Sequence, residues 1–280
     1  MRSVIEGFEL AIPDEHPRVH ALRAREMIVK AAEQGLLADS ALIAHGRGEA
    51  FDYLLGEQTC KQAVLAIRHA LGVLSEARHP VISVNGNTVA LAGREALILA
   101  GMIGASVEVN LFYRTPERIR KLTNHLKEIR TSIIEERNIP RPLRAKVSLD
   151  EWTNMVGHIP VLGAEPDGFI PGLEGARAKV CEKGILSADV VFVPLEDGDR
   201  CEALVAMDKS VINVDLNPLS RSARMATITI VDDVKRCLSA MIDTMSDGLI
   251  IQDWNNSANL TASLSVMTTA LERIYADEVK

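Results

Sequence analysis

Guanidinium, hydroxyl and amide groups follow a short apolar segment near residue 215. The segment 211–215 is rich in β-branched residues, as expected of a buried parallel strand, and Leu216-Asn217-Pro218 ends it. We predict a loop after it, whose polar residues are Asn217, Ser220, Arg221, Ser222 and Arg224. Ligands of open parallel sheets bind beyond the carboxyl ends of strands, and these groups suit an anion such as phosphate. They are equally typical of a solvated turn, so both interpretations stay open.

A second set of candidate groups is His45-Gly46-Arg47-Gly48, which interrupts an apolar, helix-like pattern. We predict a loop here, because glycines on both sides of Arg47 let the backbone approach a ligand while the guanidinium supplies charge. His45 could act as a general base or could be a hydrogen-bonded turn residue. The sequence contains neither a Walker motif nor G-x-G-x-x-G.

Asn85-Gly86-Asn87 stands between an expected strand, 81–84, and an expected helix, 88–103. Backbone N–H groups at such a junction can hold a phosphate or carboxylate at the positive end of the helix. Asparagine also caps helices for purely structural reasons. An anion site and a cap are therefore both open.

Three carboxylates, Glu196, Asp197 and Asp199, follow the apolar strand 188–194. Carboxylates in this position can hold Mg²⁺ directly or through water, beside substrate phosphates. The alternative is that Asp199 caps the next helix and Glu196 is solvated.

Arginines crowd the first turns of a helix predicted over 16–34, at positions Arg18, Arg23 and Arg25. Cations at a helix N-terminus oppose the helix dipole, which would be explained by an anionic ligand against them. A solvated charged face is the other explanation.

The apolar spacing predicts the elements that position these groups. Helical periods cover 16–34, 61–77 and 258–275, and strands are expected at 81–84, 106–112, 188–194, 211–215 and 227–231. This βα alternation predicts an α/β fold with a mostly parallel sheet flanked by helices. We divide the chain into an N-terminal helical segment with the HGRG loop (1–79), a nucleotide-binding core (80–235) and C-terminal helices suited to core or dimer contact (236–280). The irregular segment near 137–160 is predicted as an insertion or lid.

Composition narrows the class of protein. The 280 residues are 47% hydrophobic and 25% charged, as in globular proteins. No apolar run approaches the roughly 18 residues that cross a bilayer, and the first residues are too acidic for a secretory signal, so we expect a cytoplasmic protein without membrane contact. Four isolated cysteines indicate neither a zinc cage nor a disulfide framework. The net charge of −7 gives no support to a nucleic-acid surface.

Several uninterrupted motifs together closely resemble one family. They are HGRGEAFDYLLGE (45–57), SVNGN (83–87), EVNLFYRT (108–115), VPLEDGDR (193–200), VDLNPLSRSARMA (214–226) and TITIVDD (227–233). The family is the archaeal phosphopantothenate synthetase, or 4-phosphopantoate:β-alanine ligase, and the resemblance covers roughly Pro13 to Asp233. The chain departs from the shorter family pattern between 137 and 160 and in its C-terminal helices.

The resemblance implies a Rossmann-like, homodimeric, ATP-dependent ligase of coenzyme A biosynthesis. It would join 4-phosphopantoate to β-alanine through an acyl adenylate, with Mg²⁺, giving 4'-phosphopantothenate, AMP and pyrophosphate. The ATP contacts that it implies are Arg25, Arg47, Asp215, Leu216, Asn217, Arg221, Ser222, Asp233 and Val234. We take Arg47 and Arg221 as the catalytic candidates, place His45 near the reacting carboxylate or amine, and assign Asn85, Gly86 and Asn87 to the pantoate phosphate.

Two other functions use the same kind of sheet. A nucleotide-binding regulator without turnover would bind ATP and release no pyrophosphate. A nicotinamide oxidoreductase is disfavoured by the missing G-x-G-x-x-G.

Overall fold

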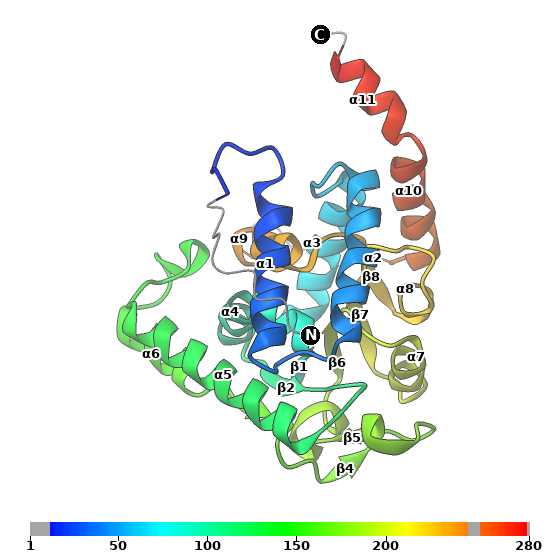
Figure 1. Cartoon of the computed structure of the whole chain (residues 1–280). Coiled ribbons are helices and arrows are strands. Elements are labelled where there is room, and N and C mark those ends of the chain that lie inside the picture. The colour runs from blue at the N-terminus through cyan, green and yellow to red at the C-terminus, as the bar shows by residue number, and fades with distance from the viewer. Residues whose placement is uncertain (1–11, 246–252, 279–280) are drawn as a thin grey trace, which may run out of the picture.

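Six parallel strands form the main sheet of the structure, a computed structural model that describes residues 12–245 and 253–278 (Figure 1). The strands lie in the order β3-β2-β1-β6-β7-β8. The chain therefore builds the sheet outward from β1 in one direction and then from β6 in the other, which is the Rossmann-like arrangement. This confirms the predicted α/β class. The strands are β1 (Pro80–Val84), β2 (Ser106–Val109), β3 (Val161–Leu162), β6 (Val190–Pro194), β7 (Ser210–Val214) and β8 (Ile228–Ile230).

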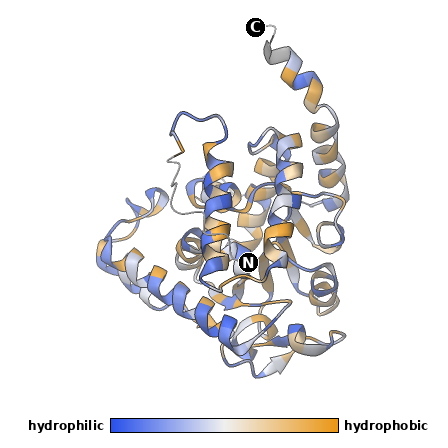
Figure 2. Ribbon diagram, viewed as in Figure 1, coloured by the Kyte–Doolittle hydropathy of each residue, from blue (hydrophilic) through white to orange (hydrophobic). Residues whose placement is uncertain are grey.

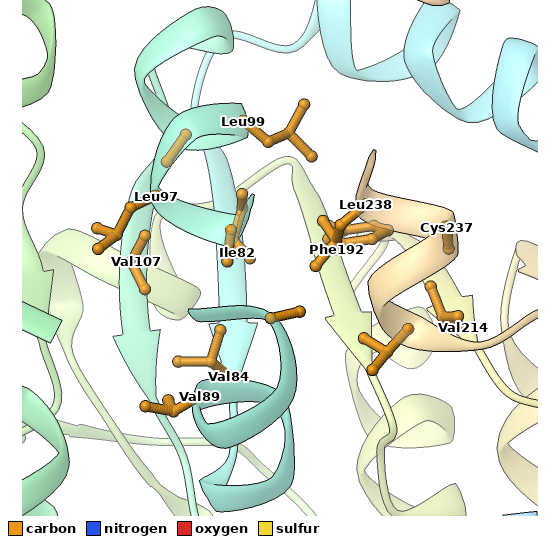
Figure 3. Packing of buried hydrophobic residues seen from close by; sticks show 14 of the residues in the cluster. Ile82, Val84, Val89, Leu97, Leu99, Val107, Phe192, Val214, Cys237 and Leu238 are labelled. Carbon is orange, nitrogen blue, oxygen red and sulfur yellow. The ribbon is translucent and has the colours of Figure 1, made fainter. Parts of the chain in front are cut away.

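Different elements cover the two faces of the sheet. Successive strand residues point to opposite faces, so Ile82 and Phe192 belong to one hydrophobic cluster while Val81 and Val191 belong to another. Figure 3 shows part of the larger cluster, to which Phe192 of β6 and Leu238 of α9 both contribute. The larger cluster is completed by α1 (Val19–Glu33), α3 (Lys61–Glu76), α4 (Gly86–Ile103), α5 (Pro116–Glu135) and α9 (Val234–Thr244), the smaller one by α7 (Gly198–Ala206). The N-terminal helices thus share the core of the sheet.

The expected HGRG loop is wrong, because residues 45–48 lie inside the continuous helix α2 (Ser40–Leu55). Glycine within a helix costs about 1 kcal/mol relative to alanine, and packing supplies the compensation. Leu55 is buried in a cluster with Leu216 and Leu260, and a Cβ on Gly48 would lie 3.5 Å from a methyl carbon of Leu216. The helix ends at Gly56, which adopts the left-handed conformation.

The segment 137–160 is a packed connection between α5 and β3, so the expectation of an irregular segment is wrong, while its role as an insertion or lid stays a prediction. It contains the short helix η1 (Arg141–Leu143) and the helix α6 (Leu149–Gly157). Trp152 and Val156 have no exposed surface. A Cβ on Gly101 of α4 would be 3.3 Å from the Trp152 ring, so that glycine leaves room for the indole.

The remaining elements are short or C-terminal. The expected polar loop after β7 contains a helix, α8 (Arg221–Met225), which begins after its N-cap Ser220. The expected helix over 258–275 is two helices, α10 (Asn256–Thr268) and α11 (Ala270–Glu278). A small antiparallel pair and two helical turns complete the described part: β4 (Gly168–Phe169), β5 (Lys179–Val180), η2 (Gly175–Ala178) and η3 (Glu182–Leu186).

The helices carry apolar stripes rather than uniformly apolar surfaces (Figure 2). In α5, Ile119, Leu122 and Leu126 are buried at helical spacing while charged residues occupy the other faces. None of the helices in the described residues is both long and apolar enough to span a membrane.

Candidate functional site

A cavity of about 810 Å³ lies beyond the carboxyl ends of the strands, where the strand order reverses between β1 and β6. Open α/β sheets bind ligands at this switch point. Residues that leave the strand ends line it: Asn85 after β1, Asn110 after β2, and Leu195, Glu196 and Asp197 after β6. The opposite walls come from α1, α2 and the first turn of α9.

Helix α2 presents one face to the cavity. His45, Gly48, Glu49 and Asp52 line it, at the spacing of residues on one side of a helix. Arg47 is exposed on another face and does not line the cavity, although its charge acts on Asp215. The structure therefore brings His45, but not Arg47, to the cavity wall.

His45 is a candidate proton acceptor at the cavity wall. It is half-buried, and burial lowers its pKa below the ordinary value. Its Nε2 is buried and has no hydrogen-bond partner among the described residues. A neutral ring with a free nitrogen at a cavity wall can exchange a proton with a ligand.

Arg25, one of the expected ATP contacts, is engaged by a carboxylate at the edge of the cavity. Its Nε and Nη2 donate to Glu49 at 2.9 and 2.6 Å, and Glu49 and Glu57 also accept from Arg18 at 2.6 and 2.7 Å. The hydrogen bond from Arg25 is the main cause of the lowered pKa of Glu49. Of the three crowded arginines, Arg18 and Arg23 line the cavity, whereas Arg25 does not.

A buried ion-pair network ties α2 to the first turn of α9. Arg236, which lines the cavity, donates to Asp52 at 2.5 Å and to Asp232 at 2.7 Å. Asp232 has no exposed surface, and burial raises its pKa despite the guanidinium. Asp233 accepts from the backbone N–H of Arg236 and caps α9, and it lines the cavity with Val234 as the resemblance implies for ATP.

The side chains of Asn85 and Asn87 hold the strand ends and helices together. Asn85 Oδ1 accepts from the Thr88 N–H at 3.0 Å, which confirms the cap, and Asn85 Nδ2 donates to the Leu195 carbonyl at 2.5 Å. Asn87 donates to the carbonyl of Ala41 at 3.1 Å.

Gly86 is needed for packing at the same junction. A Cβ there would approach the Leu37 side chain to 2.7 Å and the Leu36 carbonyl oxygen to 3.1 Å. Asn85, Gly86 and Asn87 all line the cavity. Their role as an anion site stays a prediction.

Asp215 shapes the segment that follows β7. Its carboxylate accepts from Ser220 Oγ at 2.5 Å, Ser222 Oγ at 3.0 Å and the Asn217 N–H at 2.9 Å. Burial raises its pKa, and these hydrogen bonds oppose that shift. Of the expected ATP contacts in this segment, only Leu216 lines the cavity.

Arg221 points to a second hollow of about 430 Å³, next to the main cavity's Asp197 wall. It forms close ion pairs with Asp199 and Glu202. Arg177 continues the chain of charges, with contacts to Asp197 at 2.7 Å and Asp199 at 3.2 Å. Arg221 is therefore connected to the cavity residue Asp197 only through Asp199 and Arg177, a path of three ion pairs.

The expected three-carboxylate magnesium site is not formed. Within the described ranges, no three His, Cys, Asp or Glu side chains are placed together to hold a metal ion. Arg177 engages Asp197 and Asp199, and Glu196 accepts from the Asp197 N–H and faces Arg200 at 3.4 Å. The helix cap is Asp197, not Asp199.

Asn110 and Arg118 are among the cavity residues that were not predicted from the sequence, as are Glu49, Asp52 and Arg236. Strand β2 ends at Val109 instead of continuing to Phe112, so Asn110 is the first residue beyond it. The Asn110 N–H still donates to Val84 O at 2.8 Å before the chain turns away. The polar residue Asn110 within the apolar part of the EVNLFYRT motif could have indicated that the strand ends there.

Comparison with known proteins identifies the family. A family model described as phosphopantothenate/pantothenate synthetase matches residues 62–270, a range that contains every described strand. The chain belongs to this family. Helices α1 and α2, which form one wall of the cavity in this family member, precede the matched range.

Curated relatives of this synthetase family match most of the chain. The 4-phosphopantoate–beta-alanine ligase of Thermococcus kodakarensis is 49% identical over 232 residues, which is 83% of this chain and 79% of the relative. The ligase of the same name from Thermococcus onnurineus is 47% identical over the same shares. That of Methanosarcina mazei is 44% identical over 82% of this chain and 80% of the relative. The predicted family resemblance is confirmed.

Proposed function

We propose that this protein is a 4-phosphopantoate:β-alanine ligase, which uses ATP to form 4'-phosphopantothenate, AMP and pyrophosphate in coenzyme A biosynthesis. The observation that carries the proposal is the 42–49% identity to four ligases of this name over 81–83% of the chain. The switch-point cavity supports it, because it brings polar groups from several strand ends together in one concave site.

The first step activates the carboxylate of 4-phosphopantoate. A free carboxylate resists amines, because oxide would have to leave. We propose that a carboxylate oxygen attacks the α-phosphorus of ATP, so that a new P–O bond forms while the bond from that phosphorus to the bridging oxygen of pyrophosphate breaks. The product of this step is an acyl adenylate. Positioning and charge neutralisation dominate such transfers, so the site needs no covalent protein nucleophile.

The second step forms the amide. The neutral amine of β-alanine attacks the acyl carbon, a C–N bond forms, and the C–O bond to AMP breaks. The ammonium must lose a proton before attack. His45 is suited to accept it, because its Nε2 has no partner in the described residues and its lowered pKa keeps the ring neutral.

The ATP contacts that we propose remain those of the resemblance, with Arg47 and Arg221 neutralising phosphate charge. Leu216, Asp233 and Val234 support this placement, because they line the cavity at the β7 and β8 ends. Mg²⁺ would supply further charge neutralisation. We propose that it is held mainly by ATP phosphates, since Glu196 and Asp197 already accept hydrogen bonds and face arginines.

We further propose a homodimer acting in the cytoplasm. Ile43 of α2 and Leu271, Ile274 and Tyr275 of α11 are each more than half exposed, and such apolar groups are typical of subunit contacts. Light scattering would test this state, and an Ile274→Asp variant should shift the particle toward the monomer mass. An unchanged mass in that variant would place the contact elsewhere.

The experiment that tests the ligase is product analysis with ATP, Mg²⁺ and 4-phosphopantoate, with and without β-alanine. Formation of 4'-phosphopantothenate with equal amounts of AMP and pyrophosphate, only when β-alanine is present, is the expected result. ATP binding with no pyrophosphate release in any mixture would favour the nucleotide-binding regulator.

A further inference from the structure

Among the residues that the structure describes, four arginines line the cavity, and they differ in their partners. Arg18, Arg23 and Arg236 each form an ion pair with at least one carboxylate. Within the residues that the structure describes, Arg118 forms no ion pair, although it lines the same cavity. A guanidinium that faces a cavity without a carboxylate keeps its charge available for an anionic ligand.

The guanidinium of Arg118 is held at one side only. Arg118 lies in the first turn of α5, where its backbone N–H donates to the cap Thr115 at 3.2 Å. Its Nη1 donates to the carbonyl of Tyr113 at 2.7 Å. Among the described residues, Nε and Nη2 have no hydrogen-bond partner, so that edge of the group can bind two oxygens of one oxyanion.

Arg118 lies across the sheet from the implied ATP contacts Asp233 and Val234. It follows β2 in the chain, whereas Asp233 and Val234 follow β8. Four strand spacings separate β2 from β8 in the sheet order, which is about 19 Å at the usual spacing. The cavity can therefore hold two anionic ligands with their phosphates apart and their reacting groups at the central strands β1 and β6.

The neighbouring polar groups are less available. The side-chain amides of Asn85 and Asn87 donate to Leu195 and Ala41. Asn110, beside Asn85 in the paired strands, is 5% exposed, and its Oδ1 is buried without a partner in the described part of the chain. That oxygen requires a donor, and a hydroxyl group of a bound ligand would provide one.

We propose that Arg118 binds the phosphate of 4-phosphopantoate at the β2 end of the cavity. This inference rests on the proposed function and names the protein group that recognises the phosphorylated substrate. With the phosphate at Arg118, the substrate carboxylate extends toward the ends of β1 and β6, where the α-phosphate of ATP arrives from the β7 and β8 side. The 2-hydroxyl of pantoate then passes near Asn110.

The test compares 4-phosphopantoate with unphosphorylated pantoate in the wild-type protein and in Arg118→Ala. The ratio of kcat/KM for the two substrates should fall about 10- to 100-fold in Arg118→Ala, the effect expected from losing a charge-assisted contact. The KM values for ATP and β-alanine should stay within about twofold. Arg118→Lys keeps the positive charge but lacks the planar guanidinium. Its ratio of kcat/KM for the two substrates should therefore lie between those of the wild type and Arg118→Ala.

Arg120→Ala is the matched control, since Arg120 is an exposed residue of the same helix that does not line the cavity. It should keep the wild-type ratio. An unchanged ratio in Arg118→Ala, or an effect on the KM of β-alanine alone, would overturn the proposal, the latter by assigning the arginine to the amino-acid carboxylate. Circular dichroism identifies a misfolded variant, in which case Arg118→Lys and Arg118→Gln decide.

Calorimetric binding separates this proposal from the ligase itself. If the wild-type protein forms no phosphopantothenate, the proposed function fails. Binding of 4-phosphopantoate and pantoate can still be compared directly in that case. A phosphate-dependent affinity lost in Arg118→Ala would support the phosphate contact even then, whereas equal affinities in both proteins would contradict it.

Discussion

At the scale of single residues, the cavity contains strong charges that are mostly engaged with each other. Glu49 and Asp52 neutralise Arg18 and Arg236, and Arg221 is paired with Asp199 and Glu202. The exposed pairs of Arg221 hold side chains in place rather than adding much stability, whereas the pair of Arg236 with Asp52 is largely buried. A ligand phosphate must therefore either displace a carboxylate from one of these arginines or bind Arg118, the cavity arginine for which the described residues provide no ion pair.

Arg221→Ala should lower kcat/KM of the ligase by about 10²- to 10³-fold, as for the loss of a group that stabilises transition-state charge. The reason is that the family resemblance implies Arg221 in phosphate binding, and ion pairs through Asp199 and Arg177 connect it to the cavity residue Asp197. Steady-state kinetics with ATP and 4-phosphopantoate would measure the effect. Arg224→Ala serves as the control, because Arg224 is an exposed residue of the same helix. Wild-type turnover by Arg221→Ala would remove this arginine from the mechanism.

His45 should set the acid limb of the pH–rate profile. Its pKa is lowered by burial, so the imidazole stays neutral and able to accept a proton until the pH falls below the ordinary histidine range near 6.5. The wild-type kcat should decline only below that range. His45→Gln should lose about 10²-fold or more of kcat together with this limb. A variant with the same profile and rate as the wild type would exclude His45 as the base.

At the scale of secondary-structure elements, apolar runs bounded by polar residues were readily predicted. Strands β1, β6 and β7 lie close to their expected positions because both of their faces are buried, which requires continuous β-branched sequence. The prediction of a loop at the HGRG segment was wrong, because its glycines suggested a loop while contacts of α2 with Leu216 favour a helix. The prediction of an irregular segment at 137–160 was wrong, because the prolines near its start suggested a loop although helix α6 forms around Trp152.

The site was partly predictable for the same reason. Residues just beyond strand ends, such as Asn85, Glu196 and Asp233, were found because strand ends can be located in a sequence. Arg118 could not be found, because nothing in the sequence shows which arginines have carboxylate partners. Tertiary packing also determines which face of α2 lines the cavity. His45 lies on that face, whereas Arg47 does not.

Trp152→Ala should lower the free energy of unfolding by about 3 to 5 kcal/mol, because it empties a fully buried site against α4. The KM values should change little, since Trp152 does not line the cavity. Urea unfolding would measure the loss, with the exposed Asn154→Ala expected within about 0.5 kcal/mol of wild type. A large change in KM with unaltered stability would instead support a lid role for segment 137–160.

At the scale of the whole molecule, the doubly wound sheet separates two binding regions and joins them at the switch point. The β7 and β8 ends contribute Leu216, Asp233 and Val234, while the β2 end contributes Asn110 and Arg118. Helices α1 and α2 close the space above the strand ends. This arrangement suits a reaction in which a carboxylate from one side meets an α-phosphate from the other.

The most direct test of this account is the fate of oxygen when 4-phosphopantoate labelled with ¹⁸O in its carboxylate reacts with ATP and β-alanine. Attack of the carboxylate on the α-phosphorus predicts that one labelled oxygen leaves with AMP, detected by mass spectrometry of the purified nucleotide. Labelled inorganic phosphate together with ADP, or unlabelled AMP, would contradict an acyl adenylate and with it the mechanism proposed for this cavity.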